Sequence, residues 1–157
     1  GSAVGFDKMD ERLYGKQLKE MNVCAIFLQY GINVVPNVRS DYGYYKSILI
    51  EQLKSIKSAQ PGVSIVVIGP SDMSKNKGGN MVSYSNIPLI RDAMKEAALE
   101  TGCCFWDLYE AMGGENSMSA WVENGLAQKD YTHFSYKGAR YVGEMLYNAV
   151  MEQVEKK

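Results

Sequence analysis

The chain has few of the residues that usually build metal sites or disulfide frameworks. Its 157 residues include one histidine and three cysteines. The cysteines are Cys24, Cys103 and Cys104, an odd number with two adjacent in an apolar run, which argues against a disulfide scaffold and favours buried small hydrophobic residues. One histidine among scattered carboxylates gives no dedicated ligand set, so we expect no metal ion and no cofactor.

An excess of charge and long apolar runs are also missing. Lysine and arginine number 17 and aspartate and glutamate 18, for a net charge of -1. The chain therefore has no excess of positive charge, which nucleic-acid-binding proteins usually carry. No stretch reaches the length of a membrane span, and no signal peptide is visible. We therefore expect a small polar partner, without nucleic-acid binding or membrane insertion.

What the chain does contain is an alternation of short apolar runs and longer stretches of helical period. The nearly continuous apolar runs predict strands covered on both faces. Alternation of this kind predicts an α/β fold with a parallel sheet between helices, and the length fits a single domain over residues 1–157. The predicted strands are 22–30, 63–69 and 103–108, and the predicted helices are 11–21, Asp41 to Ala59, Asn86 to Gly102, and 136–155.

In such folds ligands bind beyond the carboxyl ends of the strands, so the residues there are the candidates for chemistry. After the first strand, Gly31 permits a sharp turn and Asn33 offers an amide donor. The last loop holds Asp130 and His133, ahead of Ser135, which can cap the final helix. A carboxylate three residues before an imidazole can accept one ring N–H and leave the other nitrogen as a base. These are two members of a hydrolytic triad.

Two sequence blocks resemble those of the SGNH or GDSL hydrolases. The stretch "GINV" (31–34) is similar to the third block of that family, except that Val34 replaces an aspartate, and "DYTH" (130–133) is similar to the last block. The longer stretches "FWDLYEAMGGENSMSAW" and "GLAQKDYTHFSYKGARYVGE" resemble the C-terminal half of the branch with peptidoglycan and polysaccharide O-acetylesterases. The resemblance implies a three-layer, flavodoxin-like fold.

The resemblance also implies roles for individual residues. His133, oriented by Asp130, would deprotonate a serine that attacks an ester carbonyl. Asn33 would donate to the oxyanion together with the backbone N–H of a glycine, for which Gly1 is the first choice and Gly5 the second. The implied substrate is an acetylated carbohydrate polymer or another small ester, and the implied location is secreted or periplasmic. Candidate substrate-binding residues are Gly31 and Trp121.

The chain departs from the family pattern at the nucleophile: no G-D-S motif exists in its 157 residues. Ser71 lacks the second glycine of a nucleophile elbow, and Cys103 and Cys104 fit a core better than a site. The family's G-D-S strand lies inside the sheet, and its loss would leave backbone groups unpaired. We therefore expect the chain to be N-terminally incomplete, with its own upstream segment as a partner. The alternative is a pseudoenzyme or a module that binds a glycan or a protein.

Two further features allow more than one interpretation. Trp121 is either partly buried core or a platform that stacks on a sugar ring, whereas Trp106 fits the core. The polar stretch 74–86 predicts a flexible loop at the rim of the crevice.

Overall fold

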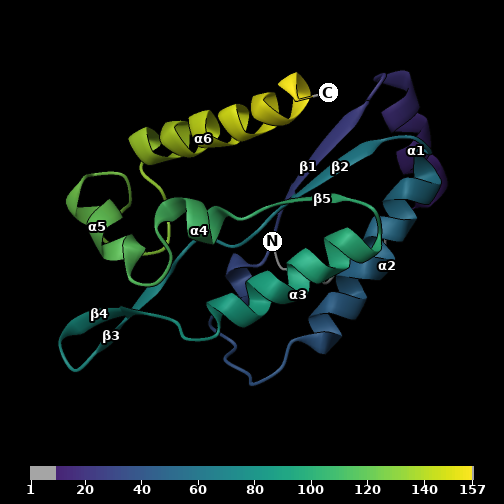
Figure 1. The fold of residues 1–157 in the computed structure, drawn as a ribbon. Helices are drawn as coiled ribbons and strands as arrows, with labels where there is room; N and C mark the ends of the chain where they lie inside the picture. Colours follow the sequence, from purple (N-terminus) through teal and green to yellow (C-terminus); the bar gives the residue numbers. More distant parts are fainter. Residues whose placement is uncertain (1–9, 157) are drawn as a thin grey trace. The chain divides into compact units, whose positions relative to one another are not determined.

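The computed structural model describes residues 10–156, so the predictions for Gly1 and Gly5 lie outside the described residues. The described chain divides into two compact units, unit 1 with residues 10–70 and 85–108, and unit 2 with residues 71–84 and 109–156. Figure 1 shows the elements of both, and each unit is described by itself. The expectation of a single domain stays a prediction.

Unit 1 is a parallel sheet with helices packed on it. Its strand order is β1-β2-β5, and both neighbouring pairs are parallel (Figure 1). The helices pack in chain order, α1 against α2 and α2 against α3, with α3 also contacting β2 and β5. The predicted parallel α/β sheet is therefore confirmed. The elements are α1 (Glu11–Glu20), β1 (Ala25–Gln29), the 3-10 turn η2 (Ile32–Val34), α2 (Gly43–Ala59), β2 (Ser64–Ile68), α3 (Ile87–Glu100) and β5 (Cys104–Trp106).

The two faces of this sheet differ in burial, which corrects the expectation of strands covered on both faces. Ile65 and Val67 are almost fully buried, whereas Phe27 on β1 is 49% exposed. Register places Phe27 beside Val66, and Val66 beside the exposed Cys104, so these three share one face. Because side chains alternate along a strand, an apolar run still presents every second residue to the other face.

The cysteines correct a second expectation. All three are free, as expected, but only Cys103 is buried, whereas Cys24 and Cys104 are exposed. Position explains the difference, because Cys24 precedes β1 and Cys104 lies on the open face of the sheet. The apolar context of the adjacent pair predicted burial correctly for one member only.

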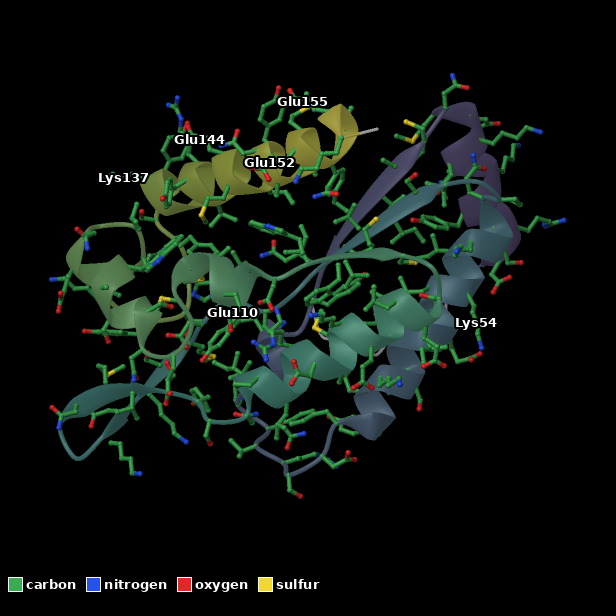
Figure 2. The ribbon with its side chains drawn as sticks, viewed as in Figure 1. Lys54, Glu110, Lys137, Glu144, Glu152 and Glu155 are labelled. Atoms are coloured by element: carbon green, nitrogen blue, oxygen red, sulfur yellow. The ribbon has the colours of Figure 1, made fainter. Side chains whose placement is uncertain are left out.

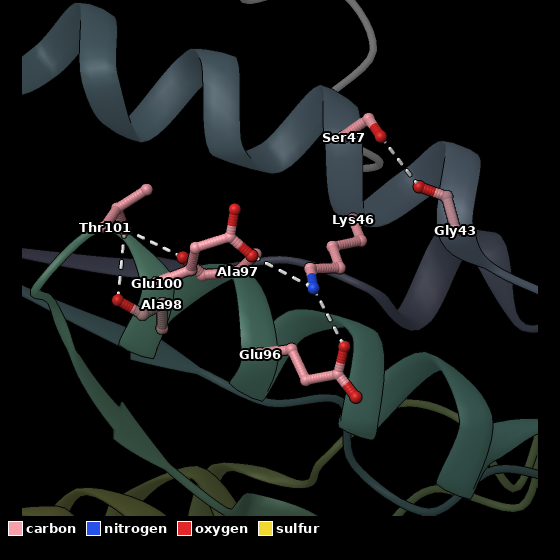
Figure 3. Close-up of polar contacts among 8 residues, drawn as sticks. All are labelled: Gly43, Lys46, Ser47, Glu96, Ala97, Ala98, Glu100 and Thr101. Atoms are coloured by element: carbon pink, nitrogen blue, oxygen red, sulfur yellow. Dashed lines mark hydrogen bonds and ion pairs between the residues drawn. The ribbon is translucent and has the colours of Figure 1, made fainter.

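Helices α2 and α3 pack against each other and share two ion pairs at the surface. Lys46 on α2 contacts Glu96 and Glu100 on α3, each at 3.0 Å (Figure 3), and these hydrogen bonds raise the pKa of Lys46. Ion pairs at the surface contribute little to stability, because water screens the charges. Truncation of a buried leucine such as Leu53, which is 0% exposed, costs roughly 2–5 kcal/mol. Burial of apolar residues on α2 therefore contributes more to stability than these ion pairs do.

The predicted helix ends agree closely with the structure, although the starts of α2 and α3 are held differently from the start of α6. Ser135 caps α6 and accepts a hydrogen bond from the Gly138 N–H at 3.1 Å, as predicted. Asp41 accepts from the Gly43 N–H, one residue ahead of the N-cap of α2. Asn86 is the N-cap of α3, but its side chain makes no capping bond and instead donates to the Val35 carbonyl at 2.9 Å.

Unit 2 contains an element that the sequence analysis missed. Residues 74–86, predicted as a loop, include an antiparallel hairpin of β3 and β4. Gly78 and Gly79 at its tip both have positive φ, and a Gly-Gly pair is a known hairpin signal. Helix α4 begins at the last residue of unit 1. The remaining elements are β3 (Ser74–Lys77), β4 (Asn80–Ser83), α4 (Leu108–Met112), α5 (Ser117–Glu123) and α6 (Tyr136–Glu155).

The final helix, α6, is long, and most of its surface is partly or fully exposed. Gly138 is its one buried residue, and its apolar residues Val142 and Leu146 are half-buried. Charged side chains are distributed along its length, among them Lys137, Glu144, Glu152 and Glu155 (Figure 2). Across residues 10–156, no helix combines the length and the apolar character needed to cross a membrane.

We expect Gly138→Ala to destabilise unit 2, because a Cβ at Gly138 would lie 1.7 Å from the Leu126 carbonyl oxygen. Overpacking against rigid backbone costs about 1–3 kcal/mol. At Gly143, on the same helix, a Cβ would meet no atom within 4 Å, so Gly143→Ala should instead stabilise by about 0.5–1 kcal/mol. Urea unfolding measures both changes. Equal effects of the two substitutions would contradict the close packing at Leu126.

Candidate active site

Asp130 and His133 form a hydrogen-bonded pair in the loop before α6. The Asp130 Oδ2 lies 2.7 Å from the His133 Nδ1. The Asp130 Oδ1 accepts two backbone hydrogen bonds, from Thr132 N and His133 N, both at 3.0 Å. The imidazole is open to solvent, with 73% of its side chain exposed. One carboxylate therefore both shapes the turn and orients the ring.

The turn that carries this pair is closed by its own backbone. Gln128 N–H donates to the His133 carbonyl at 2.8 Å, and Tyr131 N–H donates to the Gln128 carbonyl at 3.0 Å. Ala127 and Phe134 form an isolated antiparallel bridge across the base of the turn. Tyr131, between the two polar residues, has a φ of 54°, which non-glycine residues rarely adopt. This left-handed residue lets Asp130 reach the N–H groups that follow it.

Hydrogen bonds keep the Asp130 carboxyl ionised. The His133 backbone N–H, followed by the His133 ring and then the Thr132 N–H, lowers the pKa of Asp130 from 3.8 to about 2. An ionised carboxylate only accepts hydrogen bonds, so Nδ1 of His133 carries the proton in the neutral ring. The Nε2 atom is then left with its lone pair facing outward. This is the arrangement of a general base held in one tautomer.

The start of α6 supports the turn from one side. The Ser135 N–H donates to the Leu126 carbonyl at 3.0 Å, and the Ser135 hydroxyl donates to the Gly125 carbonyl at 2.6 Å. Trp121 is only 6% exposed and its indole N–H donates to the Met112 carbonyl at 3.0 Å. Its ring packs against Phe134, with centroids 5.4 Å apart. In this structure Trp121 is core, so it supports the loop rather than presenting an open face to a sugar.

Asp72 is a residue in unit 2 whose importance the sequence analysis missed. Its side chain is fully buried, and its carboxylate accepts hydrogen bonds from the hairpin and from the start of α5. The available signal was an aspartate four residues after the end of β2, in "GPSDM". Its neighbour Ser71 is 5% exposed, and the expectation that Ser71 is not a nucleophile stays a prediction.

Unit 1 holds the other predicted site residues. Asn33 lies in η2, directly after β1, and is exposed. Gly31 is buried with a φ of 98°, and a Cβ there would meet the Met94 sulfur at 2.7 Å. Gly31 therefore serves the turn and the packing on α3, and the structure does not place it on a binding surface. The side-chain amide of Asn86 anchors this loop through the Val35 carbonyl.

Other site types are not evident in the described part of the chain. No group of three or more metal-ligating side chains is found among residues 10–156. An open groove of about 630 Å³ runs along α1 and the end of α2, and its lining includes Arg12, Lys16 and Lys19. None of the predicted site residues lines this groove. The Asp130–His133 pair therefore remains the candidate centre.

The low pKa of Asp130 predicts when the pair breaks. A folded-state pKa of about 2, below the ordinary 3.8, means that its stabilising contribution is complete above pH 3.8 and is lost as the pH falls through 2. Carbon-13 NMR titration of the Asp130 carboxyl should give a midpoint of about 2. In His133→Ala the midpoint should rise but stay below 3.8, since backbone N–H donors remain. A wild-type midpoint at 3.8 would contradict the geometry.

Comparison with known proteins adds a structural relationship. No protein-family model matches the chain, and no curated protein matches its sequence significantly. It is similar to the solved structure of a peptidoglycan O-acetylesterase, with a TM-score of 0.82 and 28% identity over 91% of this chain. It also resembles the periplasmic domain of a lipopolysaccharide acetyltransferase from Salmonella ser. Paratyphi A, with a TM-score of 0.62 and 14% identity over 87% of this chain, which shows the fold alone.

The chain is shorter than both of these structures. It spans 41% of the esterase chain and 60% of the acetyltransferase domain. Both relatives handle acetyl groups according to their names. The resemblance to SGNH hydrolases suggested by "GINV" and "DYTH" is confirmed: the chain has a mixed α/β fold that matches an esterase of this type.

Proposed function

We propose that this chain carries the acid–base part of an SGNH-type serine esterase that removes acetyl groups from a carbohydrate polymer. The Asp130–His133 pair carries the proposal, because its hydrogen bond leaves Nε2 of the chain's one histidine free as a base. The similarity to a peptidoglycan O-acetylesterase supports acetyl ester chemistry on a glycan. On the basis of the same similarities, we propose that the protein acts outside the cytoplasm, as a secreted or periplasmic enzyme.

The proposed reaction proceeds in two balanced halves. Nε2 of His133 takes the proton of a serine hydroxyl, and the serine oxygen bonds to the acetyl carbonyl carbon. The C–O bond to the sugar then breaks, and His133 returns the proton to the sugar oxygen. In the second half, His133 deprotonates a water that attacks the acyl-serine, which releases acetate and restores the serine. Asp130 stabilises the protonated ring in both halves.

Two oxyanion donors complete the proposed mechanism. Asn33 would supply its exposed side-chain amide, which is the role that the resemblance implies. Gly1 would supply a backbone N–H, and this assignment stays a prediction because Gly1 lies outside the described residues.

The nucleophilic serine would come from a segment outside this chain. The Ser64 N–H donates to the Cys24 carbonyl at 3.0 Å, so the backbone groups of Cys24 point toward β2. Because backbone groups alternate in direction along a strand, those of Ala25, Phe27 and Gln29 point away from β2. No described strand pairs with this edge of β1. An open edge beside the half-exposed Phe27 suits one more parallel strand. We infer that a serine-bearing segment pairs there.

A serine-reactive probe tests the proposal. We would treat this chain and a version extended at its N-terminus with a fluorophosphonate, and measure intact mass and acetyl ester hydrolysis. We expect an adduct and turnover in the extended form only. In that form, His133→Ala should lower kcat by at least about 100-fold, because the general base is removed. Lys137→Ala, exposed in the first turn of α6, is the control and should leave kcat unchanged.

The absence of both adduct and turnover in the two forms would overturn the esterase proposal. The alternative is a pseudoenzyme that binds a glycan or a protein. Calorimetric titration with an O-acetylated glycan fragment would then distinguish the two, since binding without hydrolysis is the signature of the alternative.

A further inference from the structure

Asp72 joins three segments of unit 2 through one buried carboxylate. Its Oδ1 accepts hydrogen bonds from the Ser83 hydroxyl at 2.6 Å and from the Met73 N–H at 2.9 Å. Its Oδ2 accepts from the Met118 N–H at 2.9 Å, in the first turn of α5. The side chain is 0% exposed. These hydrogen bonds fix the hairpin against α5, because loss of a donor leaves a buried carboxylate oxygen with an unmet hydrogen bond.

A second pair of hydrogen bonds also connects the hairpin to the start of α5. The Asn116 N–H donates to the Ser83 hydroxyl at 2.8 Å, and the Ser83 N–H donates to the Asn116 side-chain oxygen at 3.1 Å. Asn116 precedes α5 directly, so β4 and the start of α5 hold each other on two sides. Polar contacts on the segments that flank and pair with β3 therefore hold the hairpin, since the sequence "SKNK" of β3 offers little apolar packing.

The first residue of β3 contacts the turn that carries the candidate base. The Ser74 N–H donates to the Tyr131 carbonyl at 3.1 Å. Tyr131 is the left-handed residue between Asp130 and His133, so a hydrogen bond to its carbonyl fixes the peptide at the centre of the turn. Ser74 is two residues after Asp72. The buried carboxylate and the Asp130–His133 pair are thus linked by a short, contiguous path.

We propose that Asp72 is a positioning residue for the Asp130–His133 pair, acting through the hairpin and the Ser74–Tyr131 hydrogen bond. Asp72 itself is sealed from solvent and touches no substrate. Its role is to hold β3 where the Ser74 N–H can clamp the Tyr131 peptide in its left-handed conformation. The catalytic meaning of this role rests on the proposed function, but the geometry can be tested without turnover.

Ser74 offers a matched pair of variants for the clamp. Its N–H points away from β4, because Tyr84 N–H bonds to the Met73 carbonyl and the ladder alternates. Ser74→Pro therefore removes the donor to Tyr131 and spares the hairpin ladder, at the first strand residue, where proline is tolerated. Ser74→Ala keeps the donor and removes a buried hydroxyl that has no hydrogen-bond partner in the structure. The two variants differ in the Ser74 N–H donor, and proline additionally fixes the φ angle of residue 74.

Because the chain has one histidine, imidazole signals in an NMR spectrum report on His133 alone. Long-range proton–nitrogen NMR spectra of the folded, nitrogen-15-labelled chain report the ring tautomer of His133 directly. We expect wild type and Ser74→Ala to show a protonated Nδ1 and an unprotonated Nε2 at pH 8. Ser74→Pro and Asp72→Asn should shift the ring nitrogens toward the mixed tautomer of free imidazole. Asp41→Asn makes the same chemical change at an exposed aspartate of unit 1 and should leave the ring unchanged.

Unchanged ring signals in folded Asp72→Asn and Ser74→Pro would overturn the inference and leave Asp72 a purely stabilising role. If those two variants do not fold, Ser83→Ala removes one partner of Asp72 and should give a partial shift, whereas no shift would again overturn it. In the extended enzyme, Ser74→Pro should lower kcat about tenfold to 100-fold with KM unchanged. A failed esterase proposal removes this kinetic effect and leaves the ring signals unaffected.

Discussion

The hydrogen bond between Asp130 and His133 is the interaction on which the candidate site depends. The same carboxylate accepts from the imidazole and from two backbone N–H groups, so one side chain determines the turn, the ring orientation and the tautomer. These bonds hold the carboxyl in its ionised form at any physiological pH. Because an ionised carboxylate cannot donate, Nε2 of the ring is left to act as the base.

The two residues of the pair lie close together in the sequence, but the turn that carries them is stabilised by contacts with more distant segments. An exposed turn of this size, with a tyrosine in the left-handed region, stores backbone strain of about 1–3 kcal/mol that the surroundings must offset. Unit 2 supplies those surroundings. The close backbone approach of Gly138 to Leu126 fixes the start of α6, and the Ser74 N–H fixes the Tyr131 carbonyl. The geometry of the solvent-exposed pair thus depends on contacts made by neighbouring segments of unit 2.

The sequence predicted the secondary structure of unit 1 more completely than that of unit 2. In unit 1, the apolar runs and the stretches of helical period predicted the strands, the helices and the parallel sheet, because these patterns depend on residues close together in the sequence. The pattern overstated burial at Phe27 and Cys104, since periodicity indicates which residues are apolar but not what covers them. In unit 2 the hairpin was missed because "SKNK" has no apolar alternation and only the Gly-Gly pair marked its turn.

The sequence by itself determined the Asp130–His133 pair, since a D-x-x-H spacing brings the carboxylate to the ring within a single turn. It also determined the α/β order and the absence of a G-D-S serine. Only the tertiary structure decided that Trp121 and Gly31 are packed rather than open, and that Asp72 is the buried junction of the hairpin and α5. The physical reason is the separation in sequence between the residues that are in contact. Contacts within three or four residues follow from local spacing, whereas burial and polar pairing across 46 residues depend on how distant segments pack.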